Sequence, residues 1–145
     1  MIAVRMFEPT DLDSCASLLI DASRGVLGMP ASMERAREYL EDVYGMIGFG
    51  GLVAVEGKRT VGFLMGFRRR WLEGDEFQVV ELGVDPAWSG RGVADELVTT
   101  LKRTLAGKGY RSMEVMTSHT VVSTHFYERH GFHPDPTVQY MRALL

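Results

Sequence analysis

The stretch VELGVDPAWSGRGVADELV, residues 80–98, restricts the fold more than any other part of the chain. An apolar run ends at Val84, and Pro86 cannot extend it because proline has no N–H to donate to a sheet ladder. Gly90 and Gly92 then allow a tight turn. An apolar stripe with helical spacing follows: Val93, Leu97, Leu101 and Leu105. A strand, a glycine turn and a helix in direct succession predict a layered α/β fold.

Hydrophobic periodicity along the rest of the chain predicts the element order β-α-α-β-β-β-α-β-α-β. The expected elements are a strand at 2–7, helices within 8–23 and 29–45, a hairpin over 51–67, a strand ending at 84, the helix beginning near 93, a strand within 110–118, a helix within 121–132 and a closing strand at 137–145. The piece from Phe77 to Ser118 should be a right-handed crossover between parallel strands. A ligand crevice is then expected at the carboxyl end of the strand that finishes at Val84.

Composition narrows the function classes. With 145 residues, 46% hydrophobic and 24% charged, the chain is expected to form one globular domain spanning 1–145. The net charge of −3 gives no electrostatic case for binding nucleic acid or an anionic membrane. Cys15 is the single cysteine, so no internal disulfide can form, and no signal peptide or membrane-spanning run is apparent. The expected location is the cytoplasm.

The glycine turn has two interpretations. It can be a plain strand-to-helix turn. Alternatively, exposed backbone N–H groups and the positive end of the helix dipole form a seat for phosphate or pyrophosphate, with Arg91 adding a charged contact. No Gly-Lys-Ser/Thr follows, which excludes a P-loop, and Asp95 stands where a dinucleotide fingerprint needs its third glycine.

Two motifs resemble the GNAT N-acetyltransferases. VELGVDPAWSGRGVADELV is similar to that family's coenzyme A motif, a strand ending in V-x-P followed by Q/R-x-x-G-x-G/A and a helix. STHFYERHGFHP, residues 123–134, is similar to its late helix, which ends in F-Y-x-x-x-G-F. The resemblance covers essentially the whole chain. It implies a GNAT-like acyl-CoA N-acyltransferase fold, in which helices flank a mixed central β-sheet, and acetyl-CoA as cosubstrate.

The resemblance also assigns residues to coenzyme binding. The six motif positions are Ser89, Gly90, Arg91, Gly92, Val93 and Ala94, and Leu82, Gly83, Val84, Thr120 and Phe126 join them from the motif strand and the late helix. Two positions depart from the family. Ser89 replaces a long Gln or Arg side chain, and Thr120 replaces a frequent asparagine. Both departures bear on coenzyme affinity.

Acetyl transfer to an amine needs a base, because an amine with a pKa near 10.4 is neutral in only about one molecule in 2,500 at pH 7. Glu81 is the candidate base. Period-2 alternation puts it on the strand face opposite Val80, Leu82 and Val84. The alternative is a solvated or ion-paired carboxylate. Glu76 and Asp75 are weaker candidates.

Tyr127 is the candidate general acid, because a phenol can return a proton to the departing thiolate. The resemblance implies that this tyrosine approaches the coenzyme sulfur. The alternative is a half-buried helix tyrosine with a solvated hydroxyl. A backbone N–H near Val84 is the candidate donor to the thioester oxygen, and Gly83 is expected to mark a bulge or a close backbone approach.

These residues predict an N-acetyltransferase that moves an acetyl group directly from acetyl-CoA to a primary amine. No metal site is expected, because the four histidines lack ligand spacing, although His119 or His125 could act as a second base. The competing hypothesis is a non-catalytic acyl-CoA-binding or interaction module of the same fold. The acceptor amine is not specified by the sequence. A homodimer through exposed strand edges is a further hypothesis with no interface assigned.

Overall fold

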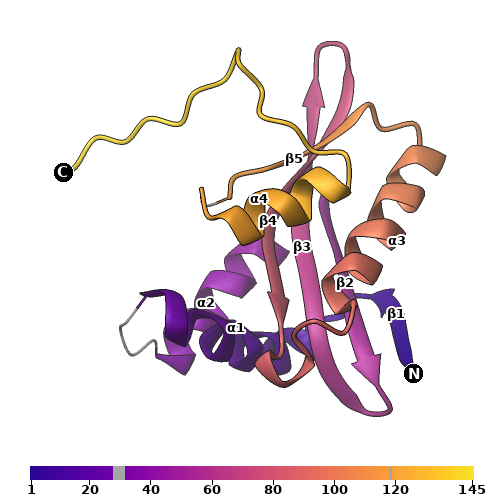
Figure 1. Ribbon diagram of the computed structural model, residues 1–145, viewed down its shortest axis with the longest axis vertical. Coiled ribbons are helices and arrows are strands. Elements are labelled where there is room, and N and C mark those ends of the chain that lie inside the picture. The colour runs from indigo at the N-terminus through magenta and orange to yellow at the C-terminus, as the bar shows by residue number, and fades with distance from the viewer. Residues whose placement is uncertain (28–31, 118) are drawn as a thin grey trace.

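The protein is built around one five-stranded mixed sheet. The computed structural model describes residues 1–27, 32–117 and 119–145. The strands lie in the order β1 (Ile2–Met6), β2 (Phe49–Glu56), β3 (Arg59–Trp71), β4 (Gly74–Val84) and β5 (Ser112–Val115) (Figure 1). The first four are antiparallel to their neighbours, whereas β4 and β5 run parallel. The predicted α/β class and mixed sheet are confirmed.

Helices cover both faces of the sheet. The helices α1 (Leu12–Leu27) and α2 (Met33–Tyr44) pack on one face, and α3 (Val93–Gly107) packs on the other. Alternation in β2 accounts for the two cores, because Val53 contributes to the α1 and α2 side whereas Leu52 and Ala54 contribute to the α3 side. The short helix α4 (Val121–Arg129) lies beside α3, and its Phe126 packs on the same core.

Local sequence signals account for several element boundaries. Ser32 caps α2 by accepting the Arg35 N–H at 2.9 Å, and Gly45 ends that helix, both as predicted. Gly57 adopts a left-handed φ of 59° in the tight turn between β2 and β3, where Glu56 pairs with Arg59. None of the described helices combines the length and the apolar character needed to cross a bilayer.

The predicted closing strand is not present as a strand. Residues 137–145 have no sheet partner and are exposed, and the chain runs away from the sheet after α4 (Figure 1). The observed order therefore ends at α4, one strand short of the prediction. Period-2 alternation identified a segment able to form a strand, but a strand also needs an edge on which to pair.

A β-bulge in β4 changes which side chains share a face. Met65 of β3 lies opposite Glu81 and Gly66 lies opposite Val79, so Val80 is an extra residue in β4. Val80 packs on the α1 and α2 side, whereas Leu82 and Val84 pack on the α3 side. The prediction that Val80 shares a face with Leu82 is therefore wrong. Glu81 still lies opposite Leu82 and Val84, and it faces α2.

Candidate active site

The chain leaves β4 through a short capped turn. Asp85 accepts the Ala87 N–H at 3.0 Å and begins the 3-10 helix η2 (Pro86–Trp88). The Arg59 guanidinium also contacts this carboxylate at 2.6 Å. The hydrogen bond from the Ala87 N–H and the contact with Arg59 together keep the Asp85 pKa below its ordinary value. The turn is therefore tied back to the β2–β3 hairpin, and α3 begins directly beyond it.

The two glycines are required by backbone conformation. Gly90 has φ 76° and Gly92 has φ 80°, the left-handed region that disfavours side chains. A Cβ added at either position would have no atom within 4 Å, so the turn is open above both residues. Gly92 is also the N-cap of α3 and supplies no side-chain cap. Neither packing nor capping explains why glycine stands at these positions. The remaining explanations are the left-handed backbone conformation and the access that a ligand has to the backbone N–H groups.

The start of α3 presents a group of backbone donors. The first N–H groups of a helix have no intrahelical acceptor, and the dipole adds partial positive charge there. In the described part of the chain, the N–H groups without a hydrogen-bond acceptor at this turn are those of Gly90, Gly92, Val93, Ala94 and Asp95. Such a group of donors is suited to bind phosphate oxygens.

The backbone N–H groups of Ser89 and Arg91 are used within the turn. The Ser89 N–H donates to the Pro86 carbonyl at 3.2 Å. The Arg91 N–H donates to the Trp88 carbonyl at 3.3 Å, and its guanidinium lies 4.8 Å from the centre of the Trp88 ring. The Arg91 side chain is exposed, so it can reach an anion at the turn by leaving the ring.

Pairing between β4 and β5 ends at Val79 and Val115, before β4 itself ends. The Asp85 N–H donates to the Val61 carbonyl of β3 at 2.9 Å. Because successive N–H groups of a strand alternate in direction, those of Val84 and Leu82 point to the side where β5 no longer pairs. They can donate to a ligand that lies along β4.

Gly83 has a packing role in place of the predicted bulge, which lies at Val80. A Cβ at Gly83 would come within 2.7 Å of the Phe63 ring. Phe63 is fully buried in the core beneath α1 and α2. The glycine therefore allows close contact between β4 and an aromatic ring of β3. A close backbone approach at Gly83 was one of the two sequence-based expectations.

Glu81 is held by a residue from α2. The Tyr39 hydroxyl donates to Glu81 Oε1 at 2.8 Å. Burial raises the pKa of Glu81 above its ordinary value, and the Tyr39 hydrogen bond partly opposes that shift. Burial and the Glu81 carboxylate together keep the Tyr39 hydroxyl protonated by raising its pKa. Glu81 is thus not fully solvated, and no cation among the described side chains forms an ion pair with it.

Tyr127 enters the same region from α4. Its ring makes edge contacts with Phe126 and Phe132 at centroid distances of 5.0 and 5.3 Å. Burial raises the pKa of Tyr127, and the negative charge of Glu81 raises it further. The charge of Glu81, on the strand before the glycine turn, thus acts on Tyr127 of the late helix, although the two residues are far apart in sequence.

Comparison with known families identifies the chain. The sequence pattern of the acetyltransferase (GNAT) family matches residues 16–132. The chain belongs to the GNAT family. It is therefore an acyltransferase of a family that transfers acetyl groups from acetyl-CoA. Comparison with curated proteins finds no significant match.

Solved structures of low identity share the GNAT fold. A protein described as a possible acetyltransferase from Clostridium difficile 630 is 14% identical, with 100% of this chain and 99% of that chain covered and a TM-score of 0.86. An acetyltransferase from Trypanosoma brucei is 22% identical, with both chains fully covered at 100% and a TM-score of 0.75. AAC(6')-Iy, solved with the bisubstrate analogue CoA-S-monomethyl-acetylneamine, is 20% identical, with coverages of 100% and 99% and a TM-score of 0.75.

The late GNAT helix is attached to α3 by contacts that the sequence did not indicate. Asp95 accepts from Arg129 at 3.0 Å and lies 2.7 Å from His130 Nε2, and Lys102 Nζ donates to the His130 carbonyl at 2.6 Å. Thr120 caps α4 by accepting the Ser123 N–H at 3.2 Å. These contacts position Tyr127. Thr120, which replaces the asparagine frequent in GNAT proteins, acts here as the N-cap of α4.

Other sequence candidates lie elsewhere or are engaged. Glu76 is buried and pairs with Arg69 at 2.9 Å, so it is committed to the β3–β4 hairpin. Within the described residues, no group of three or more His, Cys, Asp or Glu side chains could hold a metal ion. His125 is exposed on α4, and no contact links it to Glu81.

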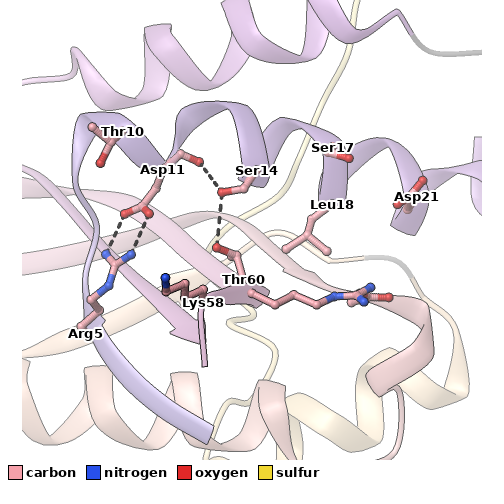
Figure 2. A pocket seen from close by; sticks show the side chains of 11 residues that line it. Arg5, Thr10, Asp11, Ser14, Ser17, Leu18, Asp21, Lys58 and Thr60 are labelled. Atoms are coloured by element: carbon pink, nitrogen blue, oxygen red, sulfur yellow. Dashed lines mark hydrogen bonds and ion pairs between the residues drawn. The ribbon is translucent and has the colours of Figure 1, made fainter. Parts of the chain in front are cut away.

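A polar pocket of about 460 Å³ lies between β1, the first half of α1 and the β2–β3 hairpin, and Asp85 of the coenzyme motif is among the residues that line it (Figure 2). Arg5 makes a two-pronged contact with Asp11 at 2.8 Å, and Ser14 donates to the Asp11 carbonyl and lies 3.3 Å from Thr60 (Figure 2). Glu81, Tyr127 and the glycine turn do not line this pocket. Its polar groups chiefly join α1 to two strands.

Proposed function

We propose that this chain is an N-acetyltransferase that transfers the acetyl group of acetyl-CoA directly to a primary amine. The observation that supports this most strongly is the half-buried Glu81 carboxylate, which the Tyr39 hydroxyl holds at 2.8 Å on the strand that leads into the glycine turn. The open donor group at the start of α3 supports coenzyme binding through its pyrophosphate. The AAC(6')-Iy complex, which contains a coenzyme A analogue of an acetylated amine, agrees with this donor and acceptor class.

In the proposed mechanism Glu81 acts as the base. Its raised pKa makes the carboxylate a better proton acceptor than a solvated glutamate. The acceptor nitrogen attacks the thioester carbonyl carbon and loses a proton to Glu81, directly or through water. The N–H groups of Val84 and Leu82 point to the side of β4 on which the developing oxyanion would lie.

Tyr127 acts as the acid in the second half of the reaction. When the C–S bond breaks, the electron pair stays on sulfur and the thiolate takes a proton from the Tyr127 hydroxyl. A raised pKa keeps that hydroxyl protonated until the thiolate forms beside it. The thiolate conjugate acid has a pKa near 8.5, so the transfer requires the two groups to be held together. Cys15 is fully buried in the first helix, which agrees with direct transfer rather than an acetyl-cysteine intermediate.

A thiol-release assay with acetyl-CoA and a panel of primary amines tests the proposal. Tyr127→Phe is expected to reduce turnover by roughly 10²-fold or more, the range for loss of one general acid or base, and to leave acetyl-CoA affinity nearly unchanged in calorimetry. Tyr110→Phe is the matched control, since its ring is also half-buried and makes an edge contact with Phe77 at 6.4 Å.

The outcomes separate the alternatives. Equal turnover in the wild type and Tyr127→Phe would contradict the acid assignment. Binding of acetyl-CoA without turnover on any amine would favour the non-catalytic acyl-CoA-binding module. Absence of both heat and thermal stabilisation with acetyl-CoA would favour an interaction domain whose glycine turn binds no coenzyme.

A further inference from the structure

One of the least exposed carboxylates of the chain stands inside the coenzyme motif. The three least exposed acidic side chains in the described part of the chain are Asp11, Glu76 and Asp85, with exposures of 5%, 6% and 7%. Each of the three is paired with an arginine. Of these pairs, the one between Asp85 and Arg59 alone includes a residue of the motif, directly before the glycine turn.

Asp85 fixes the start of the turn with three hydrogen bonds. Its Oδ1 accepts the Ala87 N–H at 3.0 Å, and its carbonyl accepts the Trp88 N–H at 2.8 Å. Its own N–H donates to the Val61 carbonyl of β3 at 2.9 Å. Only η2 then separates Asp85 from Ser89, and three residues of a 3-10 helix rise about 6 Å. The direction of the free N–H groups beyond η2 therefore depends on how Asp85 is held.

Arg59 reaches Asp85 from the β2–β3 hairpin. Its Nη2 donates to Asp85 Oδ2 at 2.6 Å, and it makes no other side-chain hydrogen bond to the described residues. Arg59 is the first residue of β3, and 67% of its side chain is exposed. The neighbouring Lys58 lines the same polar pocket (Figure 2) but forms no ion pair with a described side chain. Lys58 is thus a matched cation that does not contact the motif.

The pair also controls the charge beside the proposed pyrophosphate seat. A pyrophosphate brings negative charge to the N–H groups just beyond η2, and an unpaired Asp85 carboxylate about one Debye length away would repel it. The Arg59 guanidinium compensates that charge. Loss of Arg59 would therefore loosen the turn and leave an unpaired negative charge near the ligand.

We propose that Arg59 is a positioning residue for the coenzyme. By holding and neutralising Asp85, it orients the backbone donors of the glycine turn and sets the affinity for acetyl-CoA. This inference rests on the proposed function, because it takes the turn as the seat of the coenzyme pyrophosphate. Arg59 has no part in the chemistry, so turnover at saturating acetyl-CoA does not depend on it.

Calorimetric titration with acetyl-CoA and steady-state kinetics on one amine test the proposal. Arg59→Met keeps an unbranched stem and removes the charge. It should raise Kd and KM for acetyl-CoA by roughly tenfold and leave kcat unchanged, an effect between those of exposed and buried ion pairs. Arg59→Lys keeps a cation and should recover most of the affinity. Lys58→Met is the matched control, because it removes a positive charge one residue away, and it should leave both constants unchanged.

A double-mutant cycle with Asp85→Asn separates positioning from direct contact with phosphate. If Arg59 acts through Asp85, Arg59→Met should have little further effect on Kd in an Asp85→Asn background. An equal loss of affinity in both backgrounds would mean that Arg59 contacts the phosphate itself, and it would overturn the proposal. Hydrogen exchange reports on the turn directly, because the Ala87 and Trp88 amides should lose protection in Arg59→Met and keep it in Lys58→Met.

The outcomes distinguish this inference from the proposed function. If the wild type binds acetyl-CoA and Arg59→Met binds it equally well, this inference is overturned and the proposed function is not. A wild type that binds no acetyl-CoA overturns both. Equal losses of affinity in Arg59→Met and Lys58→Met would show that the charge of the hairpin, and not the contact with Asp85, is the cause. That comparison keeps the Asp85 side chain, so it decides the question even if Asp85→Asn does not fold.

Discussion

Replacing Tyr39 with phenylalanine removes one hydrogen bond from the proposed base and almost no volume. The Tyr39 hydroxyl donates to Glu81 Oε1 at 2.8 Å and stabilises the carboxylate relative to the neutral acid. Loss of this donor should therefore raise the pKa of Glu81 further. The base would then become ionised only at higher pH.

The size of the shift follows from the hydrogen bond. A hydrogen bond to a charged group contributes about 1.5–3 kcal/mol, and one pKa unit corresponds to about 1.4 kcal/mol, so the full effect is roughly 1–2 units. Tyr39 is 36% exposed, so water can replace part of the lost interaction. We therefore expect a shift of about 1 unit, the lower end of that range.

The assay is the pH dependence of kcat/KM for a single amine. With one acceptor throughout, ionisation of the amine contributes equally to every variant, and the difference between variants isolates Glu81. The acid limb should move upward in Tyr39→Phe, whereas the rate well above that limb should approach the wild-type rate. Tyr44→Phe is the matched control on the same helix, because its ring packs on Phe49 at 5.0 Å.

Two results would refute the reasoning. If the acid limb of the pH profile stays in place in Tyr39→Phe, ionisation of Glu81 does not control the rate. A limb that moves equally in Tyr44→Phe would mean that the shift comes from general disturbance of α2.

Three further predictions concern the glycines and Glu81. Gly90→Ala should raise KM for acetyl-CoA. Gly109 has a similar left-handed φ of 80° and equally open surroundings, so Gly109→Ala should lower stability by a comparable amount, about 1–2 kcal/mol, and leave KM unchanged. Similar KM values in both variants would contradict a coenzyme role for the turn. Gly83→Ala should lower the free energy of unfolding by about 1–3 kcal/mol because the new Cβ meets the Phe63 ring at 2.7 Å, and Phe63→Leu should restore part of it in chemical denaturation. Because burial raises the Glu81 pKa, the folded chain binds that proton more tightly than the unfolded chain, so stability falls as pH rises from the unfolded value of about 4.3 through the folded pKa. Glu81→Gln should therefore raise Tm at about pH 8 and have little effect near pH 4, and a stabilisation of equal size at both values would show that charge burial is not its cause.

Much of the site could be predicted from sequence because its signals are local. Gly90 and Gly92 adopt the left-handed φ that the motif requires, and the stripe from Val93 to Leu105 is buried as helical spacing predicts. The positions of the strand before the turn and of the late helix were likewise predicted by periodicity. Such signals depend on neighbours within a few residues along the chain.

The remaining features depend on contacts between distant segments. Val80 became the extra residue of a bulge because β3 and β4 pair in two registers on either side of it, and no alternation pattern in β4 alone contains that information. Tyr39 and Glu81 lie 42 positions apart, and their hydrogen bond exists only because α2 packs across the sheet. The attachment of α4 to α3 through Asp95 has the same origin.

The last segment shows the division between sequence and tertiary structure most directly. The sequence by itself determined that 137–145 can form a strand, since alternation and β-forming residues are properties of the segment. Tertiary structure decided that this segment pairs with no strand in the described part of the chain, because the turn at Asp135 directs it away from the sheet. Strand propensity is local, but strand pairing requires a second edge within reach, and only the fold determines where that edge lies.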